Sequence, residues 1–201
     1  MAMGVFDWIA PVYGLFYGRQ KRRYQTVLGM MRSELEAAPH GSILDVGCGT
    51  GAMCSVLNQN GFKVTGVDAV KKMLDIAAKK PENKAIDFKL ANALSGLPFG
   101  DKGFDFSIAS FVAHGLLAQE RKTLYAEMGR VTRNLVIIYD YNQNRSIPTS
   151  IIECLDGGDY FNFIKQAEVE LAESFSDVRK IDVGKRAAWY ICRPGGGHLC
   201  F

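Results

Sequence analysis

The sequence lacks a strong excess of either charge, and it lacks any long hydrophobic segment. Its 24 basic and 21 acidic residues leave a net charge of only +3 over 201 residues. Nucleic-acid binding usually needs a basic surface, so this balance predicts no nucleic-acid partner. No apolar run approaches the roughly 18 residues of a membrane-spanning helix. With 48% hydrophobic and 22% charged residues, the chain is typical of a compact globular domain.

The sequence also lacks paired cysteines. Its five cysteines are an odd number and include no C-x-x-C motif: Cys48, Cys54, Cys154, Cys192 and Cys200. This pattern predicts neither a disulfide framework nor a zinc site, and it favours a reducing, cytoplasmic compartment. His198 and Cys200 lie close together in the sequence, but the further ligands that zinc needs are missing. We therefore predict no metal site and a mobile tail over residues 194–201.

The N-terminal stretch carries its basic cluster after its apolar residues, which is the opposite of the order in a secretory signal. Asp7 and Pro11 also interrupt the apolar run, so we expect no export. Apolar residues then recur at helical spacing over residues 19–38. One interpretation is a membrane-surface anchor of aromatic and basic residues. The interpretation that we favour is a helical lid, residues 1–41, on a domain of residues 42–193.

From residue 42 onward, short apolar runs alternate with helical stretches. The runs predict strands at 42–46, 63–68, 86–91, 104–110 and 135–141, with helices at 51–60, 70–80, 118–131 and 159–173. Asp159 is the expected N-cap of the last helix. Two further strands, FSDVRKIDVG and RAAWYICR, are separated by a short turn and predict a hairpin. The pattern indicates an α/β fold, a doubly wound and mostly parallel seven-stranded sheet with helices on both faces and a C-terminal antiparallel hairpin.

The segment ILDVGCGTG, residues 43–51, is the most informative stretch of the sequence. Gly47, Gly49 and Gly51 alternate between a predicted strand and a predicted helix, where glycine permits positive φ and the helix N-terminus offers free N–H groups. The spacing is G-x-G-x-G and differs from the G-x-G-x-x-G of dehydrogenases. Asp45 would repel a pyrophosphate but attract an ammonium group. Asp68 ends the next strand, where a carboxylate can accept ribose hydroxyls. The implied ligand therefore carries a ribose and a cation.

The motifs D-V-G-C-G-T-G and V-T-G-V-D-A resemble those of class I S-adenosylmethionine-dependent methyltransferases, over roughly residues 40–193. The nearest group is type 11, which includes ubiquinone and menaquinone C-methyltransferases and has a Rossmann-like fold. The N-terminal F-D-W-I-A-P-V-Y-G also resembles the F-D-x-x-A-x-x-Y-D opening of that group, with Gly14 in place of the last aspartate. Before the fifth strand, R-V-T-R-N-L replaces the usual R-V-L-K-P-G-G-x-L, so we expect a shorter connection there.

The resemblance implies S-adenosyl-L-methionine as the cofactor and assigns residues to its parts. Asp45 and the glycine loop would hold the methionine part, and the carbonyl of Ser110 would accept from the ammonium group. Asp68, followed by Ala69, would hold the ribose. Met73 would pack on the adenine face, although a methionine at helical spacing is more often core. Asn92, in place of the usual aspartate, and Ala93 would bind the adenine edge.

Methyl transfer needs few catalytic residues, because the methyl donor is already activated. His114 follows the fourth strand, on the edge where ligands bind, and is our candidate general base. The alternative is a histidine that only lines or caps the pocket. Tyr13 is the second candidate, closing over the cofactor or the acceptor, or it is simply a packed aromatic of the lid. Residues that could shape an acceptor pocket are Tyr141, Asn142, Tyr160 and Phe161.

Several methyl acceptors are disfavoured by missing motifs. There is no N-P-P-Y-type tetrapeptide and no Pro-Cys after the fourth strand, and that strand ends without a carboxylate for magnesium. We therefore expect an enzyme that methylates a small molecule, as a monomer or a homodimer. The alternatives are a nicotinamide-dependent oxidoreductase and a non-catalytic protein that binds S-adenosylmethionine.

Overall fold

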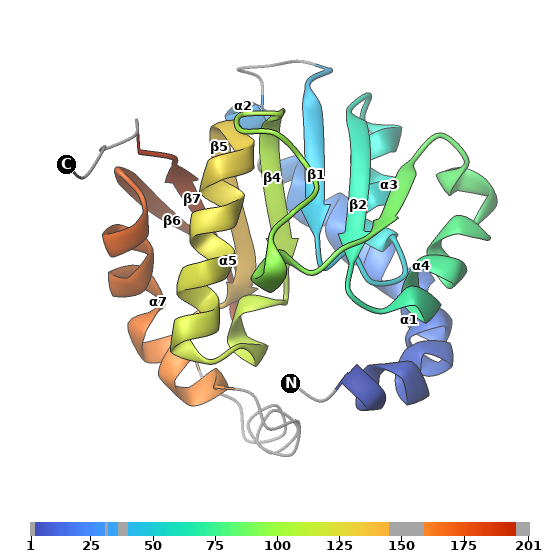
Figure 1. Ribbon diagram of the computed structural model, residues 1–201, viewed down its shortest axis with the longest axis horizontal. Helices are drawn as coiled ribbons and strands as arrows, with labels where there is room; N and C mark the ends of the chain where they lie inside the picture. Colours follow the sequence, from blue (N-terminus) through green and yellow to red (C-terminus); the bar gives the residue numbers. More distant parts are fainter. Residues whose placement is uncertain (1–2, 31, 36–39, 145–158, 196–201) are drawn as a thin grey trace. The chain divides into compact units, whose positions relative to one another are not determined.

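The structure is a computed structural model, and it describes residues 3–30, 32–35, 40–144 and 159–195. The chain divides between Asn92 and Ala93 into two compact units, called here the N-terminal unit and the C-terminal unit. Figure 1 shows the elements of each. Three strands of a seven-stranded sheet belong to the N-terminal unit and four to the C-terminal unit.

The N-terminal unit contains three parallel strands, in the order β3-β2-β1. They are β1 (Ser42–Val46), β2 (Lys63–Asp68) and β3 (Asp87–Leu90). The helices are α1 (Met3–Met30), α2 (Arg32–Leu35), α3 (Ala52–Gln59) and α4 (Lys71–Ala78), and a 3-10 turn, η1, spans Pro81–Asn83. In the register, Val46 pairs with Val67, so the ends of β1 and β2 are adjacent.

Helix α1 is a single helix that begins at Met3 and ends at Met30, whereas the apolar spacing of the sequence predicts a helix over residues 19–38. Its second half buries Tyr24, Val27 and Leu28, in agreement with the predicted apolar spacing. The Lys21 ammonium lies 3.2 Å from a carboxylate oxygen of Glu82 in η1. This half of α1 therefore packs on its own unit. The side chains of residues 3–15 lie outside the described part of the structure, and so does the side chain of Tyr13.

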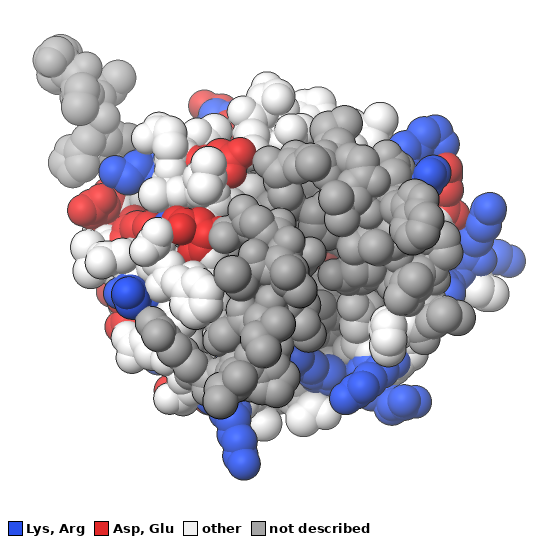
Figure 2. All heavy atoms as spheres, turned by 90° about the horizontal axis from the view of Figure 1, so that it is seen from below, with Lys and Arg blue, Asp and Glu red and all other residues white. Residues whose placement is uncertain are grey.

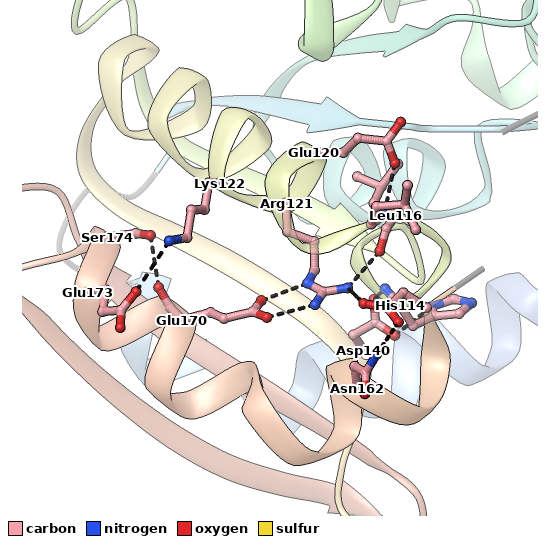
Figure 3. Close-up of polar contacts among 12 residues, drawn as sticks. His114, Leu116, Glu120, Arg121, Lys122, Asp140, Asn162, Glu170, Glu173 and Ser174 are labelled. Carbon is pink, nitrogen blue, oxygen red and sulfur yellow. Dashed lines mark hydrogen bonds and ion pairs between the residues drawn. The ribbon is translucent and has the colours of Figure 1, made fainter.

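The C-terminal unit contains four strands, in the order β4-β5-β7-β6. They are β4 (Phe104–Ser110), β5 (Thr132–Tyr141), β6 (Asp177–Gly184) and β7 (Ala187–Arg193). Strands β4 and β5 are parallel, whereas β7 is antiparallel to both β5 and β6, which confirms the predicted C-terminal hairpin. Helices α5 (Ala118–Val131) and α7 (Tyr160–Ser174) lie side by side in Figure 1, and 3-10 turns span Ala93–Ser95 (η2) and Ala113–Gly115 (η3).

Two details of this unit differ from the sequence prediction. Strand β5 begins at Thr132, directly after α5 and three residues earlier than predicted, so the connection is shorter, as the missing glycine pair indicates. The Thr132 hydroxyl donates to Ser107 Oγ of β4 at 2.7 Å, and this bond holds the start of β5 against β4. Asp159 occupies the N-cap position of α7 but makes no side-chain cap. Its carboxylate accepts instead from Arg121 (3.1 Å) and Asn162 (2.6 Å), because charged and amide donors lie close to it.

The surface carries both signs of charge, in keeping with the small net charge. Lys, Arg, Asp and Glu side chains all appear on the face that Figure 2 shows. Within the described residues, no helix is both long and apolar enough to cross a membrane. The predicted tail falls largely on residues 196–201, which lie outside the described part of the chain.

Candidate functional site

The glycine loop follows β1 and leads into α3. Gly47, Gly49 and Gly51 have φ values of 71°, 53° and 78°, the left-handed region that favours glycine. The N–H groups of Gly47 and Cys48 both donate to the Val67 carbonyl, at 2.8 and 3.0 Å. The loop is thus bound to the end of β2 in a conformation that other residues adopt at a cost, as the sequence predicts.

The glycines of this loop serve different purposes. A Cβ atom at Gly51 would lie 2.9 Å from Asn83 Nδ2 and 3.1 Å from the Phe88 ring, so this glycine permits close packing within the unit. A Cβ atom at Gly49 would meet no atom of the described residues within 4 Å. The backbone at Gly49 therefore borders open space, where a ligand can approach it closely.

Asp45 is a buried carboxylate with an unsatisfied oxygen. The side chain is 1% exposed, and its Oδ2 accepts a hydrogen bond from the Cys54 thiol at 3.0 Å. Its Oδ1 is buried and has no hydrogen-bond partner among the residues that the structure describes. The pKa of Asp45 is raised to about 7. Burial is the main cause, the hydrogen bond from the Cys54 thiol acts in the opposite direction, and the nearby charge of Asp68 adds to the effect of burial. A buried charge without donors is costly, so this site fits a bound cation that donates hydrogen bonds.

Asp68 ends β2 and is held by two backbone donors. Its Oδ2 accepts from the N–H of Gly49 and its Oδ1 from the N–H of Val70, both at 2.8 Å. Burial is the largest influence on this carboxyl and raises its pKa, against the effect of these hydrogen bonds. Each oxygen of a carboxylate can accept more than one hydrogen bond, so Asp68 retains the capacity to accept from a pair of hydroxyls.

The other residues expected to contact the cofactor are spread over both units. Ala69 is half-buried after β2, and Met73 on α4 is buried, with 4% of its surface exposed. Asn92 is exposed at the end of the N-terminal unit, and Ala93 is buried at the start of the C-terminal unit. In the C-terminal unit, Ser110 ends β4, and its hydroxyl oxygen is buried with no hydrogen-bond partner in the described part of the structure.

His114 makes a close contact with a buried carboxylate, and the sequence does not predict it (Figure 3). It lies on η3, and its Nδ1 is 2.7 Å from Oδ1 of Asp140. Asp140 is fully buried near the end of β5, where it also accepts from the N–H groups of His114 (3.2 Å) and Tyr141 (2.8 Å). A carboxylate that is ionised only accepts hydrogen bonds, so in a neutral His114 ring this contact favours the tautomer with the proton on Nδ1 and the lone pair on Nε2.

Aromatic rings surround this histidine in the C-terminal unit. Tyr141 lies edge-to-face against both His114 and Tyr160, with ring centres 4.8 and 5.0 Å apart, and Tyr160 contacts Phe161. Phe111 joins the group with a φ of 56°, an uncommon value for a bulky residue. Three of the four predicted acceptor-pocket residues are therefore neighbours. The fourth, Asn142, is buried and donates to Asp182 of β6 at 2.9 Å, which gives it a structural contact to the hairpin.

Comparison with known proteins identifies this architecture. Residues 44–139 match the family model of the methyltransferase domain. They include the glycine loop, Asp68 and His114, and they end within β5, one residue before Asp140. The chain carries a methyltransferase domain of the type 11 group. An uncharacterized methyltransferase from Staphylococcus carnosus is 23% identical over 185 residues, which cover 89% of this chain and 87% of the relative.

Two further comparisons agree with this assignment. A demethylmenaquinone methyltransferase from Tropheryma whipplei is 40% identical over 70 residues, which are 34% of this chain and 28% of that relative. A solved S-adenosylmethionine-dependent methyltransferase from Aquifex aeolicus has the same fold, with a TM-score of 0.67 at 20% identity over 83% of this chain and 89% of that one. The protein is thus an S-adenosylmethionine-dependent methyltransferase with S-adenosylmethionine as its cofactor. None of these comparisons favours an oxidoreductase or a non-catalytic binding protein.

Proposed function

We propose that this methyltransferase methylates a small-molecule acceptor, with His114 as the general base that removes the acceptor's proton. The observation that carries the proposal is the 2.7 Å contact between His114 Nδ1 and the buried Asp140 carboxylate. Such a pairing fixes the imidazole orientation and tautomer, and it stabilises the ring after it takes up a proton.

The cofactor-binding roles follow from the geometry of the N-terminal unit. The unsatisfied Oδ1 of Asp45 would accept from the ammonium group of the methionine part, and Asp68 would accept from the ribose hydroxyls. Open space beside Gly49 would admit the ligand to the backbone, and Gly47 and Gly51 would shape the loop. When bound, S-adenosylmethionine supplies a methyl group on a sulfonium, which is already activated for displacement by a nucleophile. Met73, Asn92, Ala93 and the carbonyl of Ser110 keep the roles that the family resemblance implies.

His114 would supply the proton chemistry of the reaction. Its Nε2 lone pair would accept the proton of an O–H, N–H, S–H or acidic C–H acceptor as the new bond to carbon forms, while Asp140 holds the resulting imidazolium. Functional residues in both units follow the carboxyl ends of parallel strands, where open α/β sheets bind ligands.

Several finer features belong to the same proposal. The aromatic residues Tyr141, Tyr160 and Phe161 suit an apolar acceptor, which is also consistent with the named activity of the Tropheryma relative. Residues 1–41, with Tyr13 on α1, would form a lid that selects the acceptor. We place the protein in the cytoplasm because Cys48, Cys54 and Cys192 are free thiols.

The test is the His114→Ala variant. We expect methyl transfer to fall by about 10²–10⁴-fold, the usual contribution of a general base, on whichever acceptor from a panel of quinols, phenols, thiols and amines is turned over. Binding of S-adenosylhomocysteine, measured by calorimetry, should stay within twofold of the unmodified protein. Transfer at the original rate by His114→Ala would exclude His114 as the base.

A further inference from the structure

We propose that Arg121 is a positioning residue for His114, which holds the turn that carries the histidine in its reactive place. The inference rests on the proposed role of His114 as a base. Arg121 is completely buried on α5, and its Nη1 donates to the Leu116 carbonyl at 2.6 Å. Leu116 directly follows η3 and lies two positions after His114. Figure 3 shows the guanidinium pointing toward this turn.

Arg121 is itself held rigidly by helix α7. Its Nε and Nη2 donate to the two carboxylate oxygens of Glu170, both at 2.6 Å, in a two-pronged contact. Nη1 also donates to Asp159 at 3.1 Å, and the guanidinium lies over the Phe163 ring, 5.7 Å from its centre. Paired hydrogen bonds of this kind fix the plane of the guanidinium and hence the direction of every N–H.

Contacts with two buried side chains therefore attach the η3 turn to the rest of the C-terminal unit. At His114, the backbone N–H and the ring Nδ1 both contact Asp140 of β5. At Leu116, the carbonyl accepts from Arg121. Gly115 lies between these two points, and glycine has the largest backbone freedom. Without the contact at Leu116, two backbone hydrogen bonds within the turn, from Gly115 N–H to Val112 and from Leu116 N–H to Ala113, would hold this end of η3. We expect the ring of His114 then to lose its fixed orientation toward Asp140.

A role in stability alone explains this arrangement poorly. Replacing a buried ion pair by apolar residues of similar size is often neutral or stabilising, so the Arg121–Glu170 pair is weak evidence of a stabilising function. Helices α5 and α7 are also joined by Lys122 and Glu173, whose charged atoms lie 3.7 Å apart at an exposed position. That pair makes no contact with η3 and provides a matched control.

The experiment reads the ring of His114 directly by ¹⁵N NMR, without any acceptor. The chain has three histidines, and the His114→Ala variant identifies the signals of this one. In the unmodified protein at pH 8.5, we expect a neutral ring with its proton on Nδ1. In the double variant Arg121→Met/Glu170→Met, which removes both buried charges together, we expect a mixture of the two tautomers. Lys122→Met should leave the pattern of the unmodified protein.

The result that would overturn the proposal is an unchanged His114 tautomer in the folded double variant. Should that variant fail to fold, Arg121→Lys carries the test, because lysine keeps the charge but cannot reproduce the fixed fork that reaches Glu170 and Leu116 together. A mixed tautomer in Arg121→Lys supports the proposal, and an unchanged one refutes it. Failure of the proposed function is seen separately, as methyl transfer by His114→Ala at the original rate, because the NMR measurement needs no turnover.

Discussion

Asp45 in the N-terminal unit and Asp140 in the C-terminal unit are both buried, yet their carboxylates have very different surroundings. Asp140 accepts from the His114 ring and from two backbone N–H groups. Asp45 accepts from one weak donor, the Cys54 thiol, and its second oxygen has no partner in the described part of the chain. Burial raises the pKa of Asp45 to about 7.

This difference separates two kinds of functional residue. Asp140 is satisfied by the protein itself, so its contribution to His114 is in place before any ligand binds. Asp45 is left with a cost that the fold does not offset, and a cofactor ammonium group would offset it. The Asp140 arrangement is preorganised. The Asp45 arrangement lowers the stability of the free protein and leaves an acceptor available for the cofactor. Each of the following variants tests one side of this contrast.

The largest effect is expected at Gly49. Replacement by Ala places a methyl group in the open space beside the loop, so we expect the affinity for S-adenosylhomocysteine to fall by about 100-fold or more, or roughly 2.7 kcal/mol. Gly96→Ala is the matched control, because Gly96 also has positive φ and open space at its Cβ position. Both variants should lose about 1–2 kcal/mol of stability from the left-handed conformation, measured by urea unfolding.

Equal losses of affinity in the two glycine variants would show that the effect comes from general destabilisation. Retained affinity in Gly49→Ala would contradict the assignment of this loop to the cofactor.

The substitution of Asn for each aspartate should change stability in opposite directions. Asp140→Asn places an NH₂ group among donors, and we expect it to lower the free energy of unfolding by about 1–3 kcal/mol. Asp45→Asn removes a poorly satisfied charge. At pH 8 we expect it to raise the free energy of unfolding by roughly 4 kcal/mol, which corresponds to the difference between the folded and unfolded pKa values of Asp45, and to weaken cofactor binding by about tenfold or more.

The pH dependence gives the sign of the Asp45 effect. Its pKa is about 7 in the folded protein, against about 3.9 in an unfolded chain. The folded state therefore binds the proton more tightly, and stability falls as pH rises from about 4 to about 7. Unfolding curves of Asp45→Asn and the unmodified protein should nearly coincide at pH 4 and separate by pH 8. A variant that was less stable at pH 8 would contradict the unsatisfied state of this carboxylate.

Local patterns predicted the regular elements well. The bounds of β1, β2, β4 and α5 agree with the sequence prediction, because each apolar run ends at a glycine, a polar turn or a helix cap. The glycine spacing and Asp45 also pointed to the cofactor from local sequence alone. The end of a strand, a loop and the start of a helix lie within a few residues of each other there, so the sequence determines their geometry.

Contacts between distant residues were not predicted. His114 and Asp140 are 26 positions apart, and Arg121 and Glu170 are 49 apart. A signal for the first pair was present, because Ser110 of β4 is in register with Tyr139 of β5, so the residues that follow them meet at one edge. No comparable signal existed for Arg121, since a charged residue in an amphipathic helix is usually exposed. Asp159 is the N-cap residue of α7 as predicted, but its side chain makes no cap, because it contacts Arg121 from another helix.

The most direct test of this account is the number of protons released when S-adenosylhomocysteine binds at pH 7, measured by calorimetry in buffers of different ionisation enthalpy. An ammonium group against Asp45 would lower the pKa of this carboxyl from about 7, so the unmodified protein should release about half a proton per ligand. Asp45→Asn should release almost none. Proton release that is absent in the unmodified protein, or equal in the two proteins, would contradict the role of Asp45 as the receptor of the cofactor's charge.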